Sequence, residues 1–244
     1  VHHRPLCDAI AKAARVPVRH TSAIGIPIEA REAACMAVLA MLDADDDFVR
    51  AQGVYGLANA SVVTPELGEK ILTMIADTDD VALQKVGVWA VSRSGMPNAA
   101  GKLAHLAVEL PNPEVGRRVV ENLAAMRSGN AHRAMASVMA DSTSPAVRAK
   151  AAMVLGSSGR GSEAALDALI DTAIHDVDPS VRSAALRAMG SSSSPARRAA
   201  LRKLSQTASS ASVRAQAAQQ LERAEMRLGD RTEVARRFAS TNKS

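Results

Sequence analysis

Apolar positions recur along this sequence in one phrase, repeated six times at a nearly constant interval. The fullest copy runs from Asp178 through Pro179 and Ser180 to Val181 and Arg182. The aligned residues of the six copies are Val49, Leu83, Val115, Val147, Val181 and Val213, separated by steps of 34, 32, 32, 34 and 32 residues. A fixed period of this length predicts a solenoid, in which each unit buries its apolar face against its neighbours.

The spacing inside each copy predicts a helix. The fourth and eighth residues after the repeated valine are apolar or small: Gly53/Leu57, Gly87/Val91, Val119/Leu123, Ala151/Leu155, Ala185/Met189 and Ala217/Leu221. Such residues form one core-facing stripe. The second helix (helix B) of each unit is therefore predicted at 47–58, 80–92, 113–126, 145–156, 179–190 and 211–224. The first helix (helix A) is predicted at 29–42, 65–76, 98–109, 130–140, 162–175 and 194–207.

Turn and cap residues divide the chain between these helices. Asp or Ser before Pro, as in Asp178-Pro179, is expected at a helix start. The linkers after helix B carry Gly and Ser, as in Gly156-Ser157-Ser158-Gly159. No strand pattern stands out, so the fold is predicted to be all-α. Three regions are expected: an N-terminal helix and irregular cap (1–28), the repeat array (29–224) and a basic C-terminal cap or tail (225–244).

The repeated phrase resembles the HEAT repeat, in particular its short bacterial form, the phycobilisome-lyase type. The match is strongest at Asp141 to Gly156 and Asp176 to Gly190, and weakest where Leu83-Gln84 replaces Val-Arg. The resemblance covers residues 29–224. It implies a right-handed α-solenoid of about six HEAT-like helical hairpins.

An arginine follows the repeated valine in four units: Arg50, Arg148, Arg182 and Arg214. Their fixed spacing suggests either a row of phosphate-binding groups or a structural ladder. In HEAT arrays this arginine typically pairs with an aspartate in a neighbouring inter-helix turn. The turns here supply Asp43, Asp77, Asp141 and Asp176. The structural ladder is therefore the favoured interpretation.

Charge is distributed unevenly along the chain. Residues 1–122 carry 12 basic and 15 acidic side chains, whereas residues 123–244 carry 18 and 10. This polarity suggests an anionic partner near the C-terminus, with a solvated, arginine-rich cap as the alternative. The candidate anion-binding residues, which would serve a nucleic-acid-binding array, are Arg197, Arg198, Arg202, Lys203, Arg223, Arg227, Arg231, Arg236 and Arg237, with Arg214 beside them.

Position six of helix B, opposite the core stripe, carries Tyr55, Trp89, Glu121, Met153, Arg187 and Gln219. In HEAT arrays helix B usually lines the concave face, which would place the two aromatic residues on adjacent units. Aromatic residues beside Arg and Met are typical of a protein-binding surface. The candidate partner-binding residues are Tyr55, Lys85, Trp89, Arg117, Arg118, Glu121, Met153 and Arg187. The alternative role for Trp89 is packing between helices.

The sequence offers no catalytic, metal or cofactor site. Its six histidines are scattered, and the His-Glu pairs of HEAT-like iron hydroxylases are absent. Aromatic residues are only 2% of the chain, fewer than the related DNA glycosylases would need, and no pocket for a phycobilin-lyase chromophore is defined. The expected function is a non-enzymatic protein-binding scaffold or adaptor, or an assembly subunit of a larger complex. Nucleic-acid binding is the alternative, and a lyase or glycosylase is less favoured.

The beginning of the chain bears on its compartment. It starts at Val1 without a methionine, and Cys7 and Cys35 have no metal or redox spacing, which leaves a disulfide between them open. No apolar run approaches the ~20 residues of a membrane span. A cytoplasmic location is expected, with an exported or organellar one as the alternative.

Overall fold

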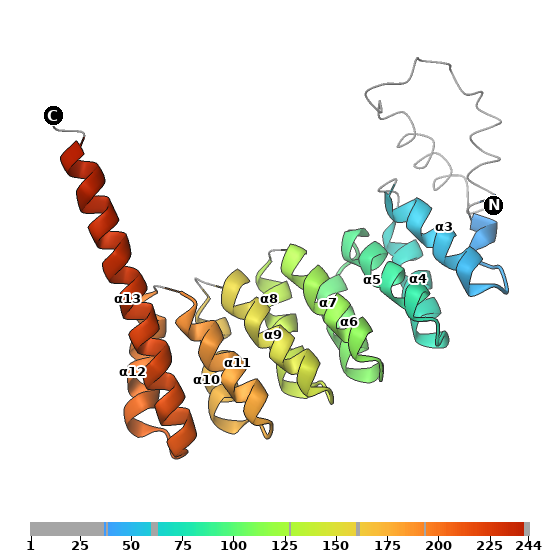
Figure 1. Cartoon of the computed structure of the whole chain (residues 1–244). Coiled ribbons are helices and arrows are strands. Elements are labelled where there is room, and N and C mark those ends of the chain that lie inside the picture. The colour runs from blue at the N-terminus through green and yellow to red at the C-terminus, as the bar shows by residue number, and fades with distance from the viewer. Residues whose placement is uncertain are drawn as a thin grey trace.

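The computed structural model describes residues 37, 39–59, 63–126, 128–159, 162–192 and 194–241, with the side chains of 230–241 left aside. In this part of the chain the regular elements are all α-helices (Figure 1). They are α3 (Asp47–Asn59), α4 (Pro65–Asp77), α5 (Val81–Arg93), α6 (Ala99–Glu109), α7 (Pro113–Met126), α8 (Gly129–Asp141), α9 (Pro145–Ser158), α10 (Glu163–His175), α11 (Pro179–Gly190), α12 (Pro195–Thr207) and α13 (Ala211–Thr241).

The helices form a two-layered row. The odd-numbered helices α3 to α13, which are the predicted B helices, each pack on the next odd-numbered helix. The even-numbered A helices pack on the B helix that follows them, as α4 does on α5 and α12 on α13. Figure 1 shows the hairpins side by side along one axis. Buried apolar residues form one continuous core between the layers, from Leu42 to Ala217. The predicted all-α solenoid is confirmed.

The helix boundaries agree with the sequence prediction to within two residues, apart from one helix end. Polar side chains accept the first free N–H groups at several helix starts: Thr64 accepts from Leu67, Ser128 from Ala131, and Ser162 from Ala165. Such caps satisfy donors that the helix itself cannot. Local sequence therefore fixes where these helices begin.

The last helix differs from the prediction. Helix α13 runs for 31 residues, from Ala211 to Thr241, whereas a change from helix B to a basic cap or tail was expected near residue 225. In Figure 1 it extends well past its neighbour α12. The expected N-terminal cap (1–28), the Cys7–Cys35 disulfide and most of the first helix A lie outside the described residues.

Neighbouring B helices touch at the ninth position after the repeated valine. A Cβ atom added to Gly156 of α9 would lie 2.5 Å from Ala188 Cβ and 3.0 Å from Ala188 Cα in α11. One added to Gly190 would lie 2.9 Å from Gln220 Cβ in α13. Ala188 and Gln220 hold the same position in successive units. This recurring contact between ninth and seventh positions sets how closely successive units stack.

We expect Gly156→Ala to lower the free energy of unfolding by about 2 kcal/mol, because the added methyl group meets the α11 backbone and overpacks the contact. Gly56, in α3, is the matched control, since nothing lies within 4 Å of a Cβ placed there. Gly56→Ala should stabilise the chain by up to ~1 kcal/mol through helix propensity. Urea denaturation followed by circular dichroism measures both. Equal stabilisation of the two variants would show that α9 and α11 are not in close contact at Gly156.

Three of the four arginines that follow the repeated valine bond to the turn of their own unit. Arg148, Arg182 and Arg214 each donate to the carbonyl oxygen six residues earlier, in the preceding turn. Gln84 holds the same position in its unit and donates to the Thr78 carbonyl in the same way. The side chain at this position therefore closes the turn within its own unit.

Only Arg148 also reaches a carboxylate in the next unit. Its Nε and Nη2 donate to the two oxygens of Asp176 at 2.8 and 2.9 Å. Asp176 stands five residues before its repeated valine, a position that holds Ala44, Thr78, Leu110, Ser142 and Ala208 in the other units. The predicted partners Asp43, Asp77 and Asp141 stand six residues before, so that part of the prediction is wrong. Arg50 pairs with Asp47 of its own helix, and Arg182 and Arg214 pair with no described carboxylate.

Candidate functional site

Two aromatic side chains meet on adjacent B helices. The rings of Tyr55 (α3) and Trp89 (α5) have centroids 5.6 Å apart and are tilted by 31°. The Arg93 guanidinium lies 5.6 Å from the Trp89 ring centroid, which is a cation–π contact. Tyr55 is 51% exposed, whereas Trp89 is half-buried and also packs against the core. Trp89 thus has both a packing contact and an accessible edge.

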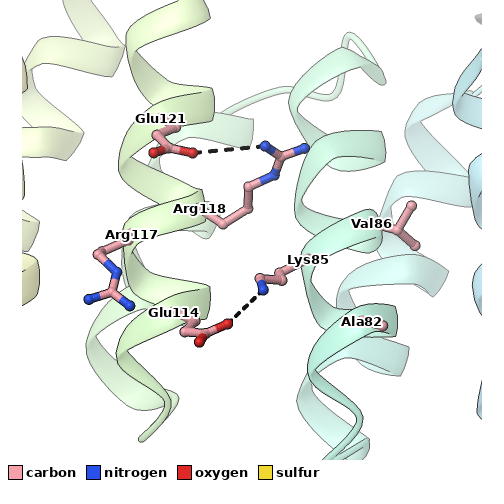
Figure 2. A pocket seen from close by; sticks show the side chains of 7 residues that line it. All are labelled: Ala82, Lys85, Val86, Glu114, Arg117, Arg118 and Glu121. Atoms are coloured by element: carbon pink, nitrogen blue, oxygen red, sulfur yellow. Dashed lines mark hydrogen bonds and ion pairs between the residues drawn. The ribbon is translucent and has the colours of Figure 1, made fainter.

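A groove lies between α5 and α7, with a volume of about 520 Å³ (Figure 2). Its lining residues are Ala82, Lys85, Val86, Glu114, Arg117, Arg118 and Glu121. They recur at intervals of three and four residues on each helix, so each helix contributes one exposed stripe. Figure 2 shows Lys85 extending from α5 toward Glu114, and Arg118 extending from α7 across the gap toward α5.

Ion pairs hold four of the groove's five charged side chains. Lys85 Nζ lies 2.6 Å from Glu114 Oε2, and its hydrogen bond and charge lower the pKa of Glu114 below its ordinary value. Glu121 accepts from Lys150 of α9 at 3.0 Å, and it lies 3.8 Å from Arg118 Nη1. Glu121 is therefore held more closely by Lys150 than by Arg118.

Two arginines of the groove have unused hydrogen-bonding capacity. Arg118 Nε is buried without a hydrogen-bond partner, and its only ion pair with a described residue is the 3.8 Å contact with Glu121. Arg117 is exposed, and no described residue forms a hydrogen bond or ion pair with it. An arginine carries five N–H donors in a planar fork, which suits a carboxylate or phosphate.

We define the α3–α9 face as Tyr55, Trp89, Arg93, the seven groove residues, Lys150 and Met153. Seven of the eight predicted partner-binding residues lie on it. The eighth, Arg187, is exposed on α11, beyond α9. Arg93 and Glu114 were missed by the sequence analysis. Arg93 stands four residues after Trp89, and this helical spacing is the signal that would have found it.

Three of the nine predicted anion-binding residues form hydrogen bonds or ion pairs within the fold. Arg197 is 1% exposed and donates to the carbonyls of Gly156, Ala188 and Gly159, so its assignment to anion binding is wrong. Arg227 donates to the Gly190 carbonyl at 2.8 Å, and Arg202 pairs with Glu225. Of the rest, Arg198 is half-buried, Lys203 and Arg223 are exposed, and Arg231, Arg236 and Arg237 belong to the part of α13 whose side chains are not described.

In the part of the chain that the structure describes, no further cluster of titratable residues indicates a metal or catalytic centre. Over the described residues, no three His, Cys, Asp or Glu side chains are placed to hold a metal ion. His105 and His175 lie in exposed pairs with Glu109 and Asp171 of their own helices. Over the same residues, no helix is long and apolar enough to span a membrane.

Among solved structures, the chain is similar to human deoxyhypusine hydroxylase in complex with glycerol. The sequences are 17% identical, the alignment covers 90% of this chain and 96% of that one, and the TM-score is 0.43. At this distance the likeness assigns no activity to this chain. The comparison does not bear out the expected non-enzymatic scaffold or adaptor, since the similar chain is by its name a hydroxylase.

No curated protein matches the sequence. A family model does match: residues 132–222, from α8 into α13, fit the description HEAT repeats. These residues include the two units in which the repeated phrase is fullest. Repeats of this kind are most often non-enzymatic and commonly mediate contacts with other proteins. The resemblance to HEAT repeats that the sequence predicted is confirmed by this match.

Proposed function

We propose that this chain binds another protein, and that the α3–α9 face carries the contact. The observation that supports the proposal most directly is the Tyr55–Trp89 pair beside the charged groove. Aromatic and arginine side chains are enriched at the energetic centres of protein interfaces, and the rims of interfaces are polar. The face combines these residue types on adjacent helices.

Apolar exposure supports the same face. Tyr55 is 51% exposed and Met153 is 54% exposed, on the first and last helices of the face. Trp89 lies between them on α5 and is half-buried. The three therefore span four successive B helices. A partner lying across these helices would cover apolar side chains that water now contacts.

Rigidity of the face would favour binding. Trp89 is held by Tyr55, by Arg93 and by the core, and the groove's ion pairs join α5 to α7 and α7 to α9. Side chains that are already ordered lose little conformational entropy when a partner arrives. Contacts made by these residues would therefore add more to the binding free energy than the same contacts made by mobile side chains.

Trp89→Ala is expected to weaken binding of the partner by about 2 kcal/mol, or roughly thirtyfold in Kd, because it removes the central ring of the face. The partner is first captured from a nuclease-treated lysate of the source organism and identified by mass spectrometry. Its affinity for each purified variant is then measured by titration calorimetry.

Val177→Ala is the matched control, since Val177 is 88% exposed in the turn before α11, away from the face. It should bind the partner as the original chain does. Unchanged affinity of Trp89→Ala, with a large fall in its melting temperature, would assign Trp89 to packing alone. Loss of every partner upon nuclease treatment would contradict a protein partner altogether.

A further inference from the structure

We infer that the segment docking on the α3–α9 face is an acidic, amphipathic stretch of polypeptide, and that Arg118 binds one of its carboxylates. The inference rests on the proposed function and names the class of partner. It starts from charge: the face carries Lys85, Arg93, Arg117, Arg118 and Lys150 against Glu114 and Glu121. The excess is positive, although the whole first half of the chain is acidic.

Arg118 is the residue best placed to take the carboxylate. Its side chain is 42% exposed and projects into the gap between α5 and α7 (Figure 2). The nearest carboxylate, Glu121, is 3.8 Å from Nη1, beyond hydrogen-bond distance, and is already bonded to Lys150. An incoming carboxylate would find a guanidinium fork that the fold has left without a close partner.

Lys85 is less suited to this role, because the fold has already used it. Its ammonium group lies 2.6 Å from Glu114, and an incoming carboxylate would have to compete with that oxygen. Arg117 is exposed at the edge of the groove and can add a second, weaker attraction. The order of importance for an acidic ligand is therefore Arg118, then Arg117, then Lys85.

The apolar part of the face requires a ligand with apolar side chains as well. Tyr55 is 51% exposed, and Trp89 and Val86 are partly exposed, so a purely charged chain would leave this apolar surface in contact with water. Glu114 and Glu121 would repel the closely spaced phosphates of a nucleic acid, whereas single carboxylates can be placed to avoid them. An amphipathic acidic segment meets both conditions.

The fluorescence of Trp89 reports on binding, because Trp89 is the only tryptophan in the sequence. The full chain is titrated with an amphipathic peptide of about 14 residues, or four helical turns, whose polar face is all glutamate. The same peptide with lysine in place of glutamate is the charge control. We expect a saturable change in Trp89 fluorescence with the glutamate peptide alone, weakened by added salt.

Arg118→Gln should weaken binding of the glutamate peptide at least tenfold, because it removes the fork and keeps most of the side chain's bulk. Arg198→Gln, on α12, should leave it unchanged. An equal response to both peptides, no response to the glutamate peptide, or unaltered binding by Arg118→Gln would overturn the inference. Tighter binding of a single-stranded oligonucleotide that displaces the peptide would do so too.

These outcomes are separable from those of the proposed function. Suppose that Trp89→Ala weakens binding of the partner but the chain does not bind the glutamate peptide. The protein-binding role would then be supported, and the acidic ligand would be contradicted. Suppose instead that peptide binding depends on Arg118 but Trp89→Ala does not change the affinity for the partner. The carboxylate site would then be supported, and the face would be contradicted as the partner's docking surface.

Discussion

Replacing Arg197 with alanine is expected to lower the free energy of unfolding by about 4 kcal/mol. The Arg197 side chain is buried in the core, and its guanidinium donates to three backbone carbonyls. Gly156 and Gly159 lie at the C-terminal end of α9, and Ala188 lies near that of α11. Without Arg197, Gly159 still accepts from the Ser162 N–H and Ala188 from the Ser191 hydroxyl, but the Gly156 carbonyl loses its donor, at a cost of about 1–3 kcal/mol. Loss of the buried side chain also leaves a cavity in the core. The positive charge is also favoured where two helix dipoles end.

Urea denaturation followed by circular dichroism measures the loss. Arg198→Ala is the matched control: Arg198 is the next residue on α12 but is half-buried, and its replacement should change stability by less than about 0.5 kcal/mol. Hydrogen exchange adds a local readout, since units of a solenoid contact only their neighbours. Protection should fall in α9 to α13 and persist in α4 to α6. Equal stability of the two variants would show that Arg197 is not a structural link.

Alignment of Arg197 to the repeat predicts that it is buried, whereas the high arginine content of this part of the sequence suggests an exposed surface. Its position in helix A is held by core residues in the preceding units: Leu67, Ala99, Ala131 and Ala165. Arg197 also stands four and seven residues before Leu201 and Leu204, on the buried stripe of α12. Because this part of the sequence is rich in arginine, the sequence analysis places Arg197 on a charged surface. Alignment to the repeat is the better guide, since it reports position relative to the core.

The helices themselves were predictable because their signals are local. Period, cap residues and apolar stripe all act within a few residues of one another, and together they fix helix ends. The length of α13 had such a signal too. Ala217, Leu221, Ala224 and Leu228 continue one stripe at helical spacing past the expected end.

The groove was harder to predict, since it depends on how neighbouring helices are aligned. The sequence indicated that position six of helix B faces away from the core, and this placed Tyr55 beside Trp89 correctly. It gave no means of knowing that Lys85 would meet Glu114, or that Lys150 would compete with Arg118 for Glu121. Such pairings depend on the close approach set by residues like Gly156, and shifting one helix by a turn would exchange the partners.

The link between Arg148 and Asp176 is the second site where we expect a large effect. Their side chains are 9% and 7% exposed, and two hydrogen bonds join them across adjacent units. Asp176→Asn should lower the free energy of unfolding by about 3 kcal/mol, because it leaves a buried guanidinium without its countercharge. Arg182→Ala is the control: it loses bonds to turn carbonyls but no carboxylate partner, and should cost about 1 kcal/mol.

The pH dependence of this link has a definite sign. Burial alone raises the pKa of Asp176, but hydrogen bonds from Arg148 and from the Asp178 backbone, with the Arg148 charge, bring it below its ordinary value of 3.8. The ionised form is thus favoured in the folded chain. Its contribution to stability is complete above the unfolded pKa and is lost as pH falls through the lower folded value.

The stability difference between the original chain and Asp176→Asn should therefore be constant above about pH 5 and shrink steadily below pH 3.8. Urea denaturation at a series of pH values measures it. Glu114, whose pKa is also lowered and which is not among the groups acting on Asp176, is present in both chains, so its contribution cancels in the difference. A difference that stayed constant down to about pH 2 would mean that the Asp176 charge does not stabilise the fold. In that case Arg148 would act only through the turn carbonyls, as Arg182 and Arg214 do.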